Sequence, residues 1–316
     1  MDELFTRYMY FLRAKAGNKK TTVEALRKFY ENYGDEKYSI LNNEDTLCDL
    51  EDLAVFWKDV NAQEKDRFSQ RVLRRLFVLQ YAPNGMWKYI VSVYFLQYRD
   101  NDNDDALDEE KFYNFLNTIT AFIWAYAIMR PGVNALRTPV FPELINIVNG
   151  KEVEFKEFKF NYDSTLNAFE NYEFTNQRPV TKSILTWWAF NDDSQSLLPL
   201  DVKLDIEHIY AKKRQEIEKS LSNSKNLESL GNKSILEKRI NIRAADYKFV
   251  DKRRYYNGYI TDQGKQKEGT NINELLVLGR EKEDFTESDL INRKEIILKG
   301  FMNYLKENEL IEEQFK

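Results

Sequence analysis

Histidine and cysteine are almost absent from this 316-residue sequence, which contains one of each. The single Cys48 has no partner for an internal disulfide, and a lone thiol excludes a cysteine-rich zinc site. We therefore expect Cys48 to be a small buried apolar residue of a protein kept in a reducing compartment. The single histidine, His208, is the one imidazole available for acid–base chemistry.

Long hydrophobic runs are also missing. The most apolar stretch, residues 119–129, is too short to span a bilayer and predicts a buried helix. Asp2 and Glu3 stand where a signal peptide has basic residues, so we expect no signal peptide. The sequence therefore predicts a cytoplasmic protein with no membrane partner.

Phosphate-binding loops are absent as well, because neither a Gly-x-x-x-x-Gly-Lys-Ser/Thr nor a Gly-x-Gly-x-x-Gly pattern occurs. Nucleotide hydrolysis is therefore not expected from this chain. A hydrophobic content of 42% in a chain of this length is enough for a sizeable core. A chain of this length favours two domains.

Positive charge is scarce overall but concentrated in one region. The net charge is −5, which by itself argues against a nucleic-acid partner. Residues 201–260, however, hold 14 Lys and Arg against nine Asp and Glu, a surplus of five positive charges that leaves −10 for the rest. This basic region also contains His208, so DNA is the expected partner.

Apolar spacing divides the chain into three parts. Helical periodicity dominates residues 1–195, with Asp108 as the expected start of one helix, and the polar stretch 191–196 marks its end. Residues 196–260 form the second part, and residues 261–316 are expected to form a loop followed by a helical segment that packs on it. We predict an α+β fold that is predominantly α-helical.

The region around His208 has the order strand, loop, strand, helix. The segment LDIEHI alternates apolar and polar residues, as a short strand does. A polar loop follows, then Gly231-Asn232 and a second strand-like run over 233–236. Ile240, Ala244 and Tyr247 have helical spacing. This order is typical of a small ββα metal-dependent nuclease.

These residues carry a family resemblance. The succession Glu-His-Ile, Gly-Asn-Lys-x-Ile-Leu and x-Ile-Asn, with Asn232 and Asn241 nine residues apart, resembles the HNH-type domain of GmrSD-like, modification-dependent (type IV) restriction endonucleases. It is more distantly similar to the HNH domain of RNA-guided CRISPR nucleases. The resemblance implies a DNA endonuclease that acts in defence against foreign or modified DNA.

Phosphodiester hydrolysis needs a base for water and a cation for the phosphate charge. His208 is the predicted base. Glu207 and Asn241 are the predicted ligands of Mg²⁺ or Mn²⁺, because hard cations prefer oxygen donors, and the resemblance places both at metal-binding positions. Asp205 is a secondary candidate for an outer carboxylate. By resemblance, Asn232 orders the loop and the catalytic histidine, although Gly-Asn is also an ordinary turn signal.

Basic and aromatic residues after the helix are expected to hold the DNA backbone. They are Lys252, Arg253, Arg254 and Tyr256, of which the resemblance favours Lys252 and Tyr256, with Lys212 and Lys213 in the loop as weaker candidates. One departure concerns Ala211, where many family members have proline. A run of charged residues such as this one is also common on a solvated surface that binds nothing.

Proteins of the GmrSD type carry a nucleotide-hydrolysing and target-sensing domain, which the resemblance places upstream of this chain or in a separate subunit. Two other readings remain open. The chain could be a catalytically inactive DNA- or protein-binding module of a restriction complex. It could also be a toxin-like or RNA-directed nuclease that uses the same site.

Overall fold

The computed structural model describes residues 1–312 except 104, 133, 246 and 247. Helices predominate in these residues, and the strands form two sheets of two strands each. The predicted α+β class with mainly helical content is confirmed. No helix within the described ranges is both long and apolar enough to cross a membrane.

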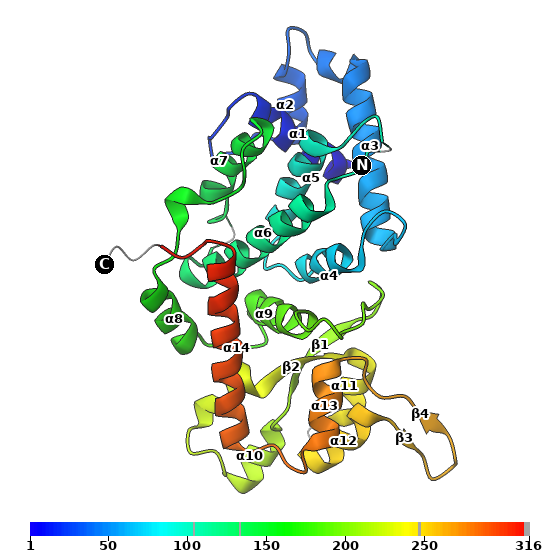
Figure 1. Ribbon diagram of the computed structural model, residues 1–316, viewed down its shortest axis with the longest axis vertical. Coiled ribbons are helices and arrows are strands. Elements are labelled where there is room, and N and C mark those ends of the chain that lie inside the picture. The colour runs from blue at the N-terminus through cyan, green and yellow to red at the C-terminus, as the bar shows by residue number, and fades with distance from the viewer. Residues whose placement is uncertain (104, 133, 246–247, 313–316) are drawn as a thin grey trace. The chain divides into compact units, whose positions relative to one another are not determined.

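The chain forms two compact units, Met1–Tyr162 together with Leu305–Lys316, and Asp163–Tyr304. The predicted division into a helical domain at 1–195, a nuclease module at 196–260 and a C-terminal segment at 261–316 stays a proposal. The first unit contains the helices α1 (Asp2–Lys15), α2 (Leu26–Asn32), α3 (Glu44–Ala62), α4 (Gln70–Leu79), α5 (Met86–Tyr98), α6 (Glu109–Met129) and α7 (Arg137–Val148), with 3-10 turns η1 (Ser39–Asn42) and η2 (Lys156–Phe158) (Figure 1).

The starts of α3, α4 and α6 in the first unit carry the side-chain caps that local sequence signals predict. The Asp108 side chain accepts a hydrogen bond from the backbone N–H of Lys111, which caps α6 as predicted. Buried aromatic rings join these helices, as in the stacked pair Phe56 and Phe95, whose ring centroids are 4.3 Å apart. Cys48 is exposed, contrary to the prediction, because α3 buries the face that carries Leu53 and leaves Cys48 on the opposite side.

The second unit contains most of the remaining elements. They are α8 (Tyr162–Asn171), α9 (Pro179–Phe190), β1 (Leu204–His208), α10 (Lys212–Glu218), η3 (Ser224–Glu228), η4 (Leu230–Asn232), β2 (Lys233–Glu237), α11 (Lys238–Ala244), α12 (Phe249–Asn257), β3 (Tyr259–Ile260), β4 (Gln266–Lys267), α13 (Asn273–Glu281) and α14 (Glu287–Glu307). α8 begins one residue before this unit, and α14 ends three residues beyond it.

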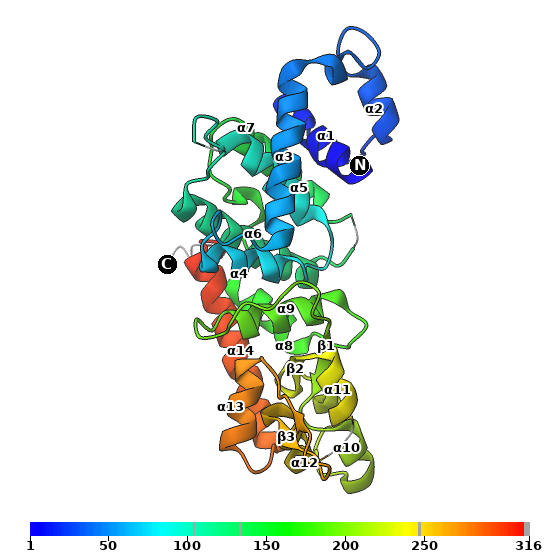
Figure 2. The same ribbon diagram turned by 90° about the vertical axis from the view of Figure 1, so that its right-hand side faces the viewer.

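An antiparallel pair of strands organises the second unit. β1 pairs with β2 from Leu204 opposite Glu237 to His208 opposite Lys233. α9 and α11 both pack on this pair (Figures 1 and 2). The predicted order of strand, strand and helix is confirmed, although the predicted helix residue Tyr247 lies outside the described residues.

Two predicted loops contain regular structure. The polar loop after β1 includes α10, which buries none of its residues and so lacks the apolar periodicity by which helices are recognised. Side-chain ion pairs support it instead, such as Arg214 with Glu218 one turn later at 2.8 Å. The polar stretch after Tyr259 folds back as the short β3–β4 pair, with Gly264 at a φ of +75° in the turn.

Candidate active site

Glu207 and His208 are neighbours at the end of β1 and face opposite sides of the strand pair. Glu207 lies opposite Ser234 in the register, and His208 lies opposite Lys233. Successive side chains of a strand point to opposite faces, so these two have different surroundings. Glu207 bonds to side chains of α12, whereas the imidazole of His208 faces Glu228.

The His208 imidazole is largely enclosed, with 11% of its side chain exposed. Its Nε2 atom is buried without a hydrogen-bond partner among the described residues, and Glu228 Oε1 lies 3.5 Å away. Burial lowers the pKa of His208 to about 4, and the positive charge of Lys233 acts in the same direction. The imidazole is therefore neutral at physiological pH and able to accept a proton.

Glu228 holds two lysine ammonium groups beside this imidazole. Lys212 Nζ lies 2.9 Å from Glu228 Oε1, and Lys233 donates to Oε2. Burial raises the pKa of Glu228, but the hydrogen bonds from the two lysines outweigh it and lower that pKa to about 2. Lys233 is fully buried and also donates to the backbone carbonyl of Phe174 and to Asn176 Oδ1.

Glu207 is part of a buried ion pair on the opposite face. Lys252 Nζ donates to Glu207 Oε1 at 2.7 Å and to the backbone carbonyl of His208 at 2.6 Å. The hydroxyl of Tyr256, one turn further along α12, donates to the same carboxylate oxygen. Burial raises the pKa of Tyr256 well above its usual value, and the charge of Glu207 adds to that effect. α12 is thereby fastened to the end of β1.

Asn232 bridges the turn before β2 and the residues that follow His208. Its Oδ1 accepts a hydrogen bond from the backbone N–H of Tyr210 at 2.7 Å, and its Nδ2 donates to the carbonyl of Tyr210. The backbone N–H of Ile209 donates to the carbonyl of Asn232. The side chain is fully buried, so these bonds fix the chain directly after His208.

A buried arginine supports the same turn from α14. Arg293 Nη1 lies within 3.1 Å of three backbone carbonyl oxygens, those of Leu230, Gly231 and Lys233. Its other donors meet Glu274 at 2.8 Å, and Glu274 also accepts from the indole N–H of Trp188. The carbonyl groups at this turn are therefore satisfied by a side chain more than 50 residues away in the sequence.

The other two predicted oxygen donors lie apart from these networks. Asn241 is half-buried on α11, and its amide makes no hydrogen bond to another described residue. Asp205 is half-buried on β1, and its charge opposes the effect of burial, which lowers the pKa of Lys182. Lys182 donates to the backbone carbonyl of Leu204.

In this conformation the donor set does not fit a divalent cation. The Glu207 side chain is 3% exposed, and its Oε1 already accepts from Lys252 and Tyr256. An ammonium group within 2.7 Å neutralises the carboxylate that a hard cation would need. No group of three His, Cys, Asp or Glu side chains suited to a metal occurs among the residues that the structure describes.

The residues predicted to contact DNA differ in burial. Lys252 and Tyr256 are buried, with their polar atoms directed at Glu207. Arg253 is half-buried and donates to the carbonyl of Gly279. The exposed cations are Arg254, which lies over the ring of Tyr259, and on α10 Lys212 and Lys213, whose side chains are 49% and 58% exposed.

Sequence reasoning did not find Glu228, Arg293 or Glu274. Glu228 precedes Asn232 by four residues in a polar stretch and has no signal of its own. Arg293 and Glu274 are charged residues on helices, which are usually solvated. The pairing of β1 with β2 places the residues just before Asn232 close to His208, so Glu228 could be found only once that pairing was known.

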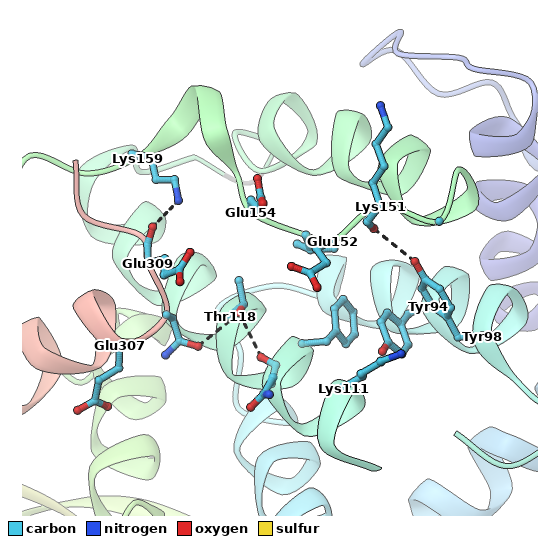
Figure 3. A pocket seen from close by; sticks show the side chains of 15 residues that line it. Tyr94, Tyr98, Lys111, Thr118, Lys151, Glu152, Glu154, Lys159, Glu307 and Glu309 are labelled. Carbon is cyan, nitrogen blue, oxygen red and sulfur yellow. Dashed lines mark hydrogen bonds between the residues drawn. The ribbon is translucent and has the colours of Figure 1, made fainter. Parts of the chain in front are cut away.

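The first unit contains a separate cavity of about 530 Å³. Tyr94 and Phe115 line one side with stacked rings, and Glu152 in the segment after α7 also lines the cavity (Figure 3). Thr118 donates to the carbonyl of Asn114 in its wall. No residue of the predicted active site lines this cavity.

Comparison with protein families finds a match that covers less than half of the chain. Residues 159–299 match the model of the C-terminal domain of GmrSD restriction endonucleases. This segment is therefore similar to the C-terminal domain of that family. Neither the curated proteins nor the solved structures contain a significant match to the chain.

The matched segment includes every residue of the predicted active site, from Asp205 to Tyr256. It also includes Glu274 and Arg293, which support the turn at Asn232. The match supports a nuclease role in restriction for this segment. Residues 1–158 lie outside the match.

Proposed function

We propose that the chain is a metal-dependent DNA endonuclease of the HNH type, which hydrolyses phosphodiester bonds in cytoplasmic defence against foreign or modified DNA. The observation that supports it best is the placement of His208 at the end of β1, inside the segment that matches restriction endonucleases. β1, β2 and α11 have the ββα order that such a site requires.

His208 is the proposed general base. Its lowered pKa leaves the imidazole neutral, so the ring accepts a proton from water without first losing one. The enclosed position also limits the ring to few orientations, which favours one direction of proton transfer. A low pKa makes it a weaker base, and a bound phosphate beside it would raise that pKa.

Asn232 is proposed to hold the histidine in place through the backbone of Ile209 and Tyr210. Lys252 contributes in the same way from the other face, because its ammonium group contacts the carbonyl oxygen of His208. Because the backbone around His208 is held from both faces, it has little freedom to move, and the direction of the imidazole is well defined.

The proposed cofactor is Mg²⁺ or Mn²⁺, which when bound would stabilise negative charge on the phosphate and the leaving oxygen. By family resemblance Glu207 and Asn241 remain its proposed ligands, and Asp205 remains a secondary candidate for an outer carboxylate. Because Lys252 occupies the Glu207 carboxylate, a cation would compete with that ammonium group for the oxygen. We expect metal affinity to depend on this exchange.

DNA is the proposed substrate, held by the exposed cations Lys212, Lys213 and Arg254, with Arg253 beside them. Lys252 and Tyr256, which the sequence also suggested for this task, contribute through the fold of the site. The target-sensing and nucleotide-hydrolysing functions are proposed to lie in an upstream domain or a separate subunit.

Cleavage of supercoiled plasmid in the presence of Mg²⁺ tests the proposal. Wild type should nick or linearise the plasmid, and His208→Ala should lower the rate by about 10²–10⁴-fold, the usual contribution of a general base. Glu295→Ala on the exposed side of α14 is the control and should cut at the wild-type rate. Equal cutting by wild type and His208→Ala, or none by either, contradicts it.

The alternative is a catalytically inactive DNA- or protein-binding module, and the ion pair at Glu207 favours it. Titration calorimetry with MnCl₂ separates the two functions. An endonuclease should take up Mn²⁺ and lose that uptake in Glu207→Gln and Asn241→Ala. A binding module should give the same trace for all three proteins. An active enzyme that prefers RNA would be recognised by faster cleavage of RNA than of DNA.

A further inference from the structure

The structure leaves one polar atom of the proposed base without a partner. His208 Nε2 is buried, makes no hydrogen bond to any described residue, and lies 3.5 Å from Glu228 Oε1. Buried ring nitrogens are normally hydrogen-bonded, so such an atom needs an explanation. In apo sites, hydrogen bonds that serve catalysis are often long and shorten when substrate binds.

Glu228 is held rigidly at this position. Its Oε2 accepts from Lys233, which belongs to β2 and stands directly opposite His208 in the register. Lys233 is itself fixed by the Phe174 carbonyl and by Asn176 Oδ1, and its side chain is fully buried. The carboxylate is therefore anchored to the same strand pair that carries the histidine.

The second oxygen of this carboxylate is shared. Lys212 Nζ lies 2.9 Å from Oε1, the atom that also faces His208 Nε2. Lys212 is half-exposed and lies on α10, among the cations proposed to meet the DNA backbone. A phosphate that binds Lys212 would draw the ammonium group away and leave Oε1 to the imidazole.

We propose that Glu228 is a positioning residue, which accepts a hydrogen bond from His208 Nε2–H and thereby keeps Nδ1 unprotonated as the atom that takes the proton from water. A neutral imidazole carries one N–H, and the group that accepts from it determines which nitrogen is free. The inference rests on the proposed nuclease function for its purpose, but the approach of the two side chains to 3.5 Å belongs to the fold and does not depend on catalysis.

The alternative is that Glu228 only neutralises Lys212 and Lys233. In that case its removal would lower stability without changing the imidazole tautomer. The single histidine of the chain makes the two cases separable, because every imidazole signal of the full-length protein belongs to His208.

The test is nitrogen NMR of the full-length chain labelled with ¹⁵N-histidine, at neutral pH. Wild type should show a protonated Nε2 and an unprotonated Nδ1. Glu228→Gln, whose amide can donate as well as accept, should shift the signals toward a mixture of tautomers. Glu228→Asp keeps a charge for Lys233 but withdraws the carboxylate oxygens from the imidazole. It should shift the nitrogen signals in the same direction, and it serves as the test variant if Glu228→Gln fails to fold. Glu295→Gln is the matched control and should leave the signals unchanged.

Plasmid cleavage by the same proteins gives the second measurement. Outer partners of metal-bound histidines contribute about 10–100-fold to activity, and we expect kcat to fall by at least that factor in Glu228→Gln with KM nearly constant. A protonated Nδ1 in wild type, or identical tautomers in wild type and both Glu228 variants, overturns the inference. The expected tautomer shift in a protein that cuts no DNA supports the contact and refutes the nuclease function.

Discussion

The buried pair of Lys252 and Glu207 allows a sharp test of the structure. At 2.7 Å and an effective dielectric constant of about 20, the Coulomb attraction between the two charges is about 6 kcal/mol, which the loss of hydration largely offsets. Removing one partner leaves the other charge buried without compensation. We therefore expect Lys252→Met to lower the free energy of unfolding by about 3–5 kcal/mol.

The double variant identifies the cause of that loss. Glu207→Gln keeps an acceptor for the Tyr256 hydroxyl while removing the charge that Lys252 balances. Combined with Lys252→Met, it should recover part of the stability, with a coupling energy of about 1–3 kcal/mol between the two positions. Lys252→Met with Glu207 unchanged should therefore be less stable than the double variant.

Urea unfolding of the full-length chain, followed by circular dichroism, measures these differences. Lys248→Met is the matched control, because Lys248 also lies at α12 but is 61% exposed and pairs with Glu218 at the surface. It should cost about 1 kcal/mol or less. If Lys252→Met costs no more than Lys248→Met, Lys252 is not buried against Glu207, and the assignment of Lys252 to the interior is wrong.

Two further predictions concern the same region. Between pH 7 and pH 4 the unfolded chain protonates His208 near its ordinary pKa of about 6.5, whereas the folded chain does so only near pH 4. The stability that the neutral His208 contributes is present above pH 6.5 and falls by about 3 kcal/mol toward pH 4. The unfolding free energies of wild type and His208→Gln should therefore converge on acidification. A difference that stays constant from pH 7 to pH 4 contradicts this. Gly231→Ala should cost about 3 kcal/mol or more in urea unfolding, because its Cβ would lie 2.0 Å from the backbone oxygen of Leu290. Gly85→Ala meets no atom within 4 Å and should stay within about 1 kcal/mol of wild type, and equal losses at both positions would refute the packing at Gly231.

The secondary structure around the site could be predicted from the sequence. Alternation in LDIEHI and the Gly-Asn signal before the second apolar run depend on neighbouring residues alone, and both strands occur where expected. α10 was missed because a helix that buries no side chain has no apolar periodicity to show. The placement of His208 at the end of a strand was therefore predictable, and the helix that follows β1 was not.

The sequence by itself determined the strand order and the one histidine on which any acid–base chemistry in this chain depends. Only the tertiary structure decided which cations serve the site. Lys252, Arg253 and Arg254 are consecutive and chemically alike, but a helix turns about 100° per residue, so packing on β1 buries Lys252 and leaves Arg254 exposed. The pairing of β1 with β2 likewise brings Glu228 to His208 across 20 residues, a distance in sequence over which no local pattern operates.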